Sequence, residues 1–576
     1  MTSAARRHGR TAVAWALAVG GVVVVASAMP WLSGDDPALR IFRARFGERP
    51  ATPQALDAIR EDLNLAANPI EGAVGWLVGL THGDLGTSWV SGRAFGSTIK
   101  DAWLVSLSLA GVATLVSLGL AILLVGPGLL RVARGLDAGS PRTTAVFAVL
   151  ASIPTMVLAI ALIALVAVRW RLLPALGWQD PVDAILPTVA LALPMSGILA
   201  RVLTSAIRTT ASEEWLFTWR ANGFRPQRLI TAVAHRALAV AIPQAFLIIA
   251  GTIGAAVLIE EIFAIPGLGR LALQAGLAQD VPVVQGALAL LVATGLVLGV
   301  LGIVSHRALL GPTLRAGHGS ALAVGQRRRN RNRRLVAVLA GILTLVIVGG
   351  AFRSAGINLD GGQFRPPSWT APMGTDALGR DVWARLSQGS LVTIGLAVLC
   401  TAICLGLGAI IGLANSRNRP GIADVLNAVP PIFMGIIMAA VLGAGLTTAT
   451  VAVCAVGWIP IAVHARTLGS EIRATGFYQA GRLSGGGRWW MLSRHLVPMA
   501  LPPLTQHALI RLPHMALALT SLSFLGIGAP HDSPEWGKVL AESAVHLERA
   551  PWITAAPALG LVALGLLATF AGEDAT

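Results

Sequence analysis

The sequence predicts an all-α polytopic membrane protein with about 12 transmembrane helices, arranged as two parallel six-helix repeats. Composition, the number of long apolar runs and the placement of arginine predict this fold. The chain has 576 residues, of which 55% are hydrophobic and 12% are charged, and its mean hydropathy is +0.70. Soluble domains carry roughly 25% charged residues. So few charges cannot form a water-soluble surface, and we expect most of the chain to lie in lipid.

Apolar runs of about 18 residues or more mark the expected spans, because a helix needs about 20 residues to cross the hydrocarbon core. In the first half these runs cover residues 11–32, 103–130, 143–168, 186–205, 238–260 and 284–306. In the second half they cover residues 335–352, 391–414, 423–444, 447–465, 499–524 and 552–571. The first run resembles a signal peptide, but it is long for one. Its removal would make the halves unequal, so we expect it to be retained.

The arginine distribution predicts the orientation of the chain. The net charge is +16, and residues 327–334 consist only of arginine and asparagine. Beside a membrane span, such a run is typical of a cytoplasmic anchor held by anionic lipid rather than of a nucleic-acid site. The alternate loops are also rich in arginine, whereas residues 33–100 mix acids and bases. The positive-inside rule therefore places both termini in the cytoplasm and residues 33–100 outside.

The number of spans predicts the domain organisation. Six spans in each half return the chain to the same side of the membrane, so the halves share one topology and form parallel repeats. We expect a first half at residues 1–311, a basic cytoplasmic linker at 312–334 and a second half at 335–576.

Each half has one long cytoplasmic loop between its fourth and fifth spans, at residues 206–237 and 466–498. In each loop a helix-compatible stretch ends at a glycine, and a histidine and a proline follow. These residues are Gly223, His235 and Pro243 in the first loop, and Gly485, His495 and Pro503 in the second. The pattern predicts a helix–turn–helix element lying against the membrane. From spacing alone, it could be a pair of interfacial helices without a partner or a docking element for a cytoplasmic protein.

The residues of these loops resemble the "EAA" loops of ABC-importer permeases, in which a short coupling helix docks into a groove on the ATPase subunit. In the first loop the resemblance is carried by Glu213, Glu214, Thr218, Arg220, Ala221, Gly223 and His235. In the second loop it is carried by Gln479, Ala480, Gly481, Arg482, Gly485, Arg494 and His495. The second loop departs from the pattern because Gln479 stands where glutamate is usual. The first also has two extra residues between its glycine and its histidine.

Other motifs resemble the dipeptide/oligopeptide/nickel permeases over nearly the whole chain. The first half carries GDLGTS at residues 83–88 and PGLGR at 266–270, as in the first permease of such systems. The second half carries GTDALGRD at 374–381 and SLSFLGIG at 521–528, as in the second permease. The resemblance implies that two permease subunits, usually separate chains, are fused here through the basic linker.

This resemblance implies a type I ABC importer-like fold and a function. The chain would be the multi-pass permease component of a binding-protein-dependent importer in a bacterial plasma (inner) membrane, with both termini cytoplasmic. Its cargo would be a short peptide or a related solute such as a nickel or opine-type chelate. Its partners would be two ATP-binding cassette subunits on the cytoplasmic side, an extracytoplasmic solute-binding protein and membrane lipid, with no nucleic acid. The translocation pathway would lie between the two halves.

The chain itself is expected not to be an enzyme and to hold no cofactor or metal. A phosphate-binding P-loop needs a lysine followed by serine or threonine, and neither Lys100 nor Lys538 meets this condition. ATP would therefore bind to the partner subunits. The alternative is a secondary transporter of the major facilitator type. That class is expected to have short outer loops and a G-x-x-x-D-R-x-G-R-like signature, which residues 131–142 lack.

We expect the individual ionisable residues that stand out in the sequence to have structural roles. We expect Asp376 to cap the helix that leads into the eighth span, and Arg380 to pair with a nearby acid. Glu260 and Glu261 are expected at the outer membrane interface. His464 has no other residue of a metal-binding type at a suitable spacing in the sequence. A membrane-embedded enzyme is disfavoured because the spans contain few ionisable groups.

Overall fold

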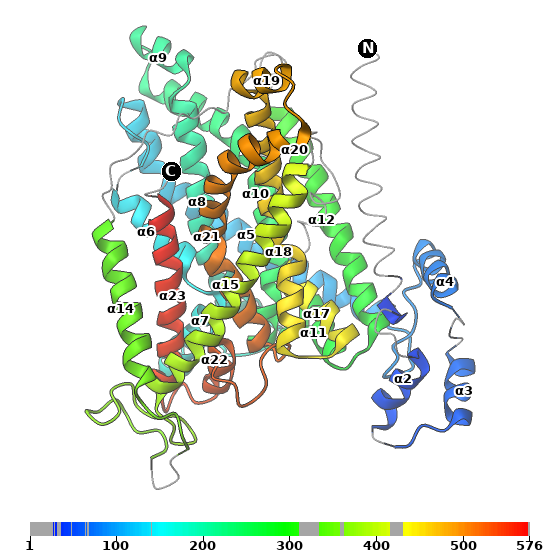
Figure 1. Ribbon diagram of the computed structural model, residues 1–576. Helices are drawn as coiled ribbons and strands as arrows, with labels where there is room; N and C mark the ends of the chain where they lie inside the picture. Colours follow the sequence, from blue (N-terminus) through cyan, green and yellow to red (C-terminus); the bar gives the residue numbers. More distant parts are fainter. Residues whose placement is uncertain are drawn as a thin grey trace. The chain divides into compact units, whose positions relative to one another are not determined.

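The computed structural model describes residues 29–31, 36–47, 49–63, 68–139, 141–309, 333–357, 362–414 and 430–573, with Ser27 and Leu65 (Figure 1). In these residues the regular secondary structure is helical, and strand-like pairing is confined to isolated bridges. Seven of the described helices are long and apolar enough to cross a membrane, and a bent helix pair is an eighth candidate. The predicted all-α polytopic fold is therefore confirmed. The expected span at 11–32 and most of the 312–334 linker lie outside the described residues.

Most expected spans of the first half correspond to long helices. They lie in α5 (Gly96–Ala133), α8 (Ile185–Ala211), α10 (Pro226–Ile262) and α12 (Val281–Leu309). The segments predicted to lie outside form the short helices α2 (Pro37–Phe46), α3 (Pro53–Asp62), α4 (Pro69–Thr81) and α11 (Leu268–Leu277). A proline occupies the first turn of α2, α3 and α4, where its missing N–H breaks no helical hydrogen bond.

The expected span at 143–168 is not one straight helix. It consists of α6 (Pro141–Ser152), α7 (Thr155–Leu162) and the π-helical segment η2 (Ile163–Arg169). The axes on the two sides of the break differ by 84°. Pro154 stands directly before α7. Proline lacks the N–H that would continue α6 and disfavours helical geometry in the preceding residue, so the helix breaks here.

The second half contains the same kind of long helices. Its spans lie in α14 (Arg333–Ala351), α15 (Val382–Ala414), α17 (Pro431–Leu442), α18 (Leu446–Ala474), α21 (Val497–Phe524) and α23 (Pro551–Glu573). The short outer helix α22 (Trp536–Ala544) lies between α21 and α23 in the sequence. By length and composition α21 is not among the seven apolar spans, because polar residues interrupt its apolar sequence.

By their contacts the residues divide into two compact units, each of which is described by itself. One unit comprises 102–270 and 290–330, and the other comprises 1–101, 271–289 and 331–575. In the first, α8 packs against α6, α7 and α10. Leu199 and Ile207 of α8 share a buried core with Leu229 and Val233 of α10.

In the second unit, α15 packs against α14, α18 and α21. A Cβ atom on Gly412 of α15 would lie 2.4 Å from the carbonyl oxygen of Ala462 on α18. Small residues permit such close approach between helices in membranes. The outer segments are fixed by polar contacts. Arg40 of α2 is 6% exposed and donates to the carbonyl oxygens of Ala440 and Val441 at the end of α17, where the helix dipole favours a cation.

Candidate functional site: the cytoplasmic loop helices

The first of the two loops predicted to be cytoplasmic contains a short helix that ends at a left-handed glycine. Helix α9 (Glu214–Ala221) precedes Gly223, whose φ is +71°. The N–H of Gly223 donates to the carbonyl of Arg220 at 3.0 Å, and the N–H of Phe224 donates to the carbonyl of Trp219 at 3.2 Å. These two bonds define a Schellman motif. The Phe224 and Trp219 rings stack at 4.7 Å and add the apolar contact typical of that motif.

Three side chains fix α9 to its own unit. Leu216 is fully buried in the core cluster of α8 and α10. The carboxylate of Glu213 accepts hydrogen bonds from Trp215 Nε1 at 2.7 Å and from Arg236 Nε at 3.1 Å. Arg220 donates to the carbonyl oxygen of Val132 at the end of α5. The helix is therefore fixed on one face, which leaves the other face free of these contacts.

The second of these loops repeats this construction. Helix α19 (Gly476–Leu483) precedes Gly485, whose φ is +87°. The N–H of Gly485 donates to the carbonyl of Arg482 at 3.2 Å, and the N–H of Gly486 donates to the carbonyl of Gly481 at 3.0 Å. This is the same Schellman motif. The prediction that a glycine ends each loop helix is therefore confirmed.

Four exposed positions are shared by the two helices when Gly223 is aligned with Gly485. The buried anchor Leu216 then corresponds to Tyr478, which is 9% exposed. Phe217 is 76% exposed and Leu483 is 89% exposed, so each helix presents a large apolar side chain. The shared exposed stripes are Glu214, Phe217, Thr218 and Ala221 on α9, and Gly476, Gln479, Ala480 and Leu483 on α19. Helix α19 also exposes Phe477 and Arg482, whose counterparts on α9 are partly buried.

The histidines that follow these helices differ in their surroundings. His235 is exposed on α10. His495 lies in a π-helical segment, Leu492–Leu496, and its ring packs against Phe477 at 5.8 Å and Trp490 at 4.9 Å. Arg494 beside it is exposed. The shared histidine-to-proline spacing therefore does not give the two histidines the same contacts.

The acid that caps α15 is Asp381 and not Asp376, so that expectation was wrong. Asp381 Oδ1 accepts from the N–H groups of Trp383 at 2.8 Å and Ala384 at 3.1 Å. Asp376 instead accepts from the side chains of Arg380 at 2.7 Å and Arg385 at 2.9 Å. The expected pairing of Arg380 with a nearby acid is confirmed.

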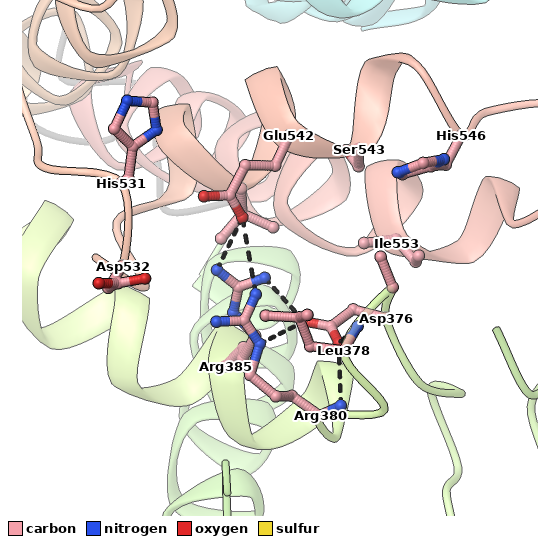
Figure 2. Close-up of a pocket in the computed structure, with 12 residues that line it drawn as sticks. Asp376, Leu378, Arg380, Arg385, His531, Asp532, Glu542, Ser543, His546 and Ile553 are labelled. Carbon is pink, nitrogen blue, oxygen red and sulfur yellow. Dashed lines mark hydrogen bonds and ion pairs between the residues drawn. The ribbon is translucent and has the colours of Figure 1, made fainter. Parts of the chain in front are cut away.

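Asp376 belongs to an ion-pair network at a cavity of about 340 Å³, shown in Figure 2. Arg385 is 4% exposed, and its guanidinium joins Asp376 to Glu542 of α22, the latter at 3.1 Å. His531 and His546 also line the cavity. Among the described residues, no group of three or more histidine, cysteine or acidic side chains could hold a metal ion. The two arginines and two acids balance one another, which favours a structural role.

Glu260 lies near the end of α10 and is buried within the protein. It is 1% exposed, and its carboxylate accepts from the Ser106 hydroxyl at 2.6 Å and from the Arg270 N–H at 3.0 Å. The neighbouring Glu261 is more exposed and pairs with Arg270 at 3.4 Å. The sequence alone could not predict this difference in burial, because Ser106 lies on α5, far from Glu260 in the sequence.

A second buried glutamate, Glu535, was not singled out from the sequence. It is 1% exposed and accepts from the Thr393 hydroxyl and from the Lys538 N–H, both at 3.1 Å. Burial raises the pKa of this carboxyl group, and hydrogen bonds from Gly537, Lys538, Ser523 and Thr393 oppose the rise. Glu535 and Glu260 thus each join a helix hydroxyl to the first N–H groups of a short outer helix.

Comparison with known proteins identifies the family. The model of the binding-protein-dependent transport system inner membrane component matches residues 141–311 and again residues 405–573, together more than half of the chain. A protein of Brucella suis biovar 1 whose name describes a peptide transport system permease is 30% identical over 246 residues, which cover 42% of this chain and 82% of the relative. The nickel transport system permease protein NikC of Escherichia coli K12 is 32% identical over 196 residues, which cover 33% of this chain and 71% of the relative. The chain is therefore a multi-pass membrane protein that belongs to the inner membrane components of binding-protein-dependent transport systems, with the family domain present twice.

Proposed function

We propose that this chain forms the translocation pathway of an importer and is driven by two separate ATP-binding cassette subunits that dock on α9 and α19. The observation that carries this proposal is the shared construction of the two helices. Both end in the same Schellman motif, both are anchored at the same position, and four exposed positions are common to both. An interfacial helix without a protein partner has no need to repeat this arrangement.

The exposed stripes suit a protein partner. Phe217 and Leu483 are large apolar side chains that are mostly exposed, and buried apolar anchors supply much of the binding energy at protein interfaces. The carboxylate of Glu213 is bonded to Arg236 within the loop, and the guanidinium of Arg220 is bonded to Val132 at the end of α5. We therefore assign these two residues to holding α9 in place, and the exposed residues Glu214, Phe217, Thr218 and Ala221 to contact with the ATPase.

The cargo and the remaining partners follow from the relatives. Relatives of this chain are named for peptide transport and for nickel transport. We propose a short peptide or a related small chelate as the cargo, delivered by an extracytoplasmic binding protein. The arginine-rich loops support the proposal that α9, α19 and both termini lie on the cytoplasmic side. The chain itself is proposed to bind no ATP and no cofactor.

Co-purification with the cognate ATPase subunits tests the docking proposal. Phe217→Asp and Leu483→Asp each place a charge in a proposed apolar contact, and we expect each to reduce the ATPase retained with the chain. Phe352→Asp is the matched control, because Phe352 is 87% exposed and lies in a segment predicted to be outside. Unchanged ATPase retention in both docking variants would show that these helices are not the docking site.

A further inference from the structure

Helix α21 carries a row of polar side chains within its membrane-spanning sequence. His507, Arg511 and His514 follow one another at helical spacings of four and three residues, so they lie on one face of the helix. Arg511 is the middle member and lies near the midpoint of α21. An ionisable residue at such a depth is costly in a membrane and marks a functional site by default.

The repeat shows that packing does not require this row. When the histidine and proline that begin the two fifth spans are aligned, Leu247, Gly251 and Gly254 of α10 correspond to His507, Arg511 and His514. The first half therefore builds the same helix with an apolar residue and two glycines. The polar row is a property of the second half alone.

Three nitrogen atoms at this place have no partner in the part of the chain that the structure describes. They are Gln506 Nε2, His507 Nε2 and Arg511 Nε, and all three are buried atoms without a hydrogen bond. A buried polar atom that lacks a partner is costly. The Gln506 amide and the Arg511 guanidinium can only donate through these nitrogens, and His507 can donate from Nε2 in one tautomer or when charged.

The surroundings of these nitrogens contain the guanidinium of Arg511 and two imidazole rings, and α15 and α21 supply no acid. The ring of His464 on α18 stacks on His507 with centroids 4.6 Å apart. Neither α15 nor α21 contains an aspartate or a glutamate. The acid that interacts with His464 is Glu471, two turns further along α18. No ion pair of Arg511 is present among the described residues, and its electrostatic neighbours are Cys404 and His507.

We propose that Gln506, His507 and Arg511 of α21, together with His464 of α18, form a site that binds a carboxylate group of the transported solute on its way through the membrane. The proposal rests on the proposed import function. A carboxylate fits because it accepts hydrogen bonds from several donors at once, and bonds between charged groups are stronger than neutral ones. The free carboxyl group of a short peptide and the carboxylates of a metal chelate share this chemistry.

Charge-selective labelling of a reporter cysteine tests the site. The reporter is His514→Cys in the full chain, with Cys400, Cys404 and Cys454 replaced by alanine, held in phosphatidylcholine nanodiscs. The negatively charged sulfonatoethyl and positively charged trimethylammonioethyl methanethiosulfonates are compared, with each rate divided by that of a free thiol. We expect the anionic reagent to be favoured by about tenfold. Arg511→Gln should abolish this preference, whereas Arg511→Lys should retain it.

Two further measurements make the test specific. N-acetyl-dialanine as the free acid should slow the labelling, and its amide should not. Gly251→Cys on α10 is the control reporter, since Gly251 stands where the second half has Arg511, and it has open space around its Cβ position. It should show no charge preference.

Any of three results would overturn the proposal. They are equal labelling rates for both reagents, a charge preference that survives Arg511→Gln, and an equal effect of the acid and the amide on labelling. If labelling of the reporter cysteine is slower in phosphatidylglycerol nanodiscs but is not slowed by the free acid, the site binds lipid. That result would also overturn the proposal. The labelling needs neither ATPase nor binding protein. Its failure can therefore be told apart from failure of the proposed import function, which is tested by uptake.

Discussion

The hydroxyl of Ser106 on α5 donates a 2.6 Å hydrogen bond to Oε1 of Glu260, which lies at the end of α10 and is 1% exposed. Ser106 also accepts from the N–H of Leu268, the first residue of α11. One buried carboxylate and one hydroxyl thus tie α5, α10 and the start of α11 together. These hydrogen bonds hold the three helices together.

Glu260→Ala should therefore destabilise the protein. The change leaves the Ser106 hydroxyl and the Arg270 N–H buried without their acceptor, at a cost of about 1–3 kcal/mol. The thermal unfolding midpoint of the purified chain measures this cost. Glu261→Ala is the control, because Glu261 forms a partly exposed ion pair, and such pairs contribute about 0–1 kcal/mol. Equal shifts for the two variants would contradict the assignment.

Glu535 predicts a dependence of stability on pH. Burial raises its pKa above the ordinary value of 4.5, so the folded state favours the protonated carboxyl group. This contribution is fully present below pH 4.5 and is lost as the pH rises through the raised pKa. Glu535→Gln, which imitates the protonated form, should make the unfolding midpoint less dependent on pH across that range. An unchanged pH profile would show that Glu535 does not carry the effect.

The two glycines that end the loop helices predict a graded loss of transport. Valine at Gly223 would be forced to a φ near +71°, at a cost of about 1–3 kcal/mol. No atom lies within 4 Å of the added Cβ, so the effect comes from backbone strain and not from a clash. We expect Gly223→Val to reduce ATPase-coupled uptake more than Gly485→Val, because the first loop matches the family pattern better.

Gly487→Val is the matched control for these variants. Gly487 also has open space around its Cβ position, but its φ is −65°. It should leave uptake near the wild-type rate, and membrane insertion should be intact in all three variants. A loss of uptake in the control as large as that of Gly223→Val would attribute the effect to added bulk in the loop.

Much of the fold could be predicted from the sequence because its signals are local. Long apolar runs predicted the spans, and the glycines predicted where α9 and α19 end. Two side-chain contacts were not predicted, because each depends on how the surrounding segments fold. Two aspartates precede α15, and only the fold of the preceding loop shows that Asp381 reaches its first N–H groups. The burial of Glu260 depends on Ser106, which is far away in the sequence.

The polar row of α21 was missed for a different reason. Counting apolar residues over 499–524 identifies a span and passes over the few polar residues within it. Their spacing along one helix face was a signal that could have found them. The stacked ring of His464, however, comes from another helix and could only be placed by the structure.

The predicted orientation can be tested with reporter fusions. The arginine bias places residues 312–334 in the cytoplasm and residues 353–389 outside. Fusions of a reporter at Gly325 and at Ser368 should therefore report opposite sides of the membrane. The same side for both would contradict the arrangement of six spans in each half.

Uptake into proteoliposomes tests the central claim most directly. The chain is reconstituted with its cognate ATPase subunits, and accumulation of a radiolabelled solute delivered by its binding protein is measured with and without ATP and with an uncoupler. The account predicts that uptake requires ATP and the ATPase subunits and that it persists when the uncoupler removes the proton gradient. Uptake by the chain alone that needs no ATP and stops with the uncoupler would contradict it and would indicate a secondary transporter.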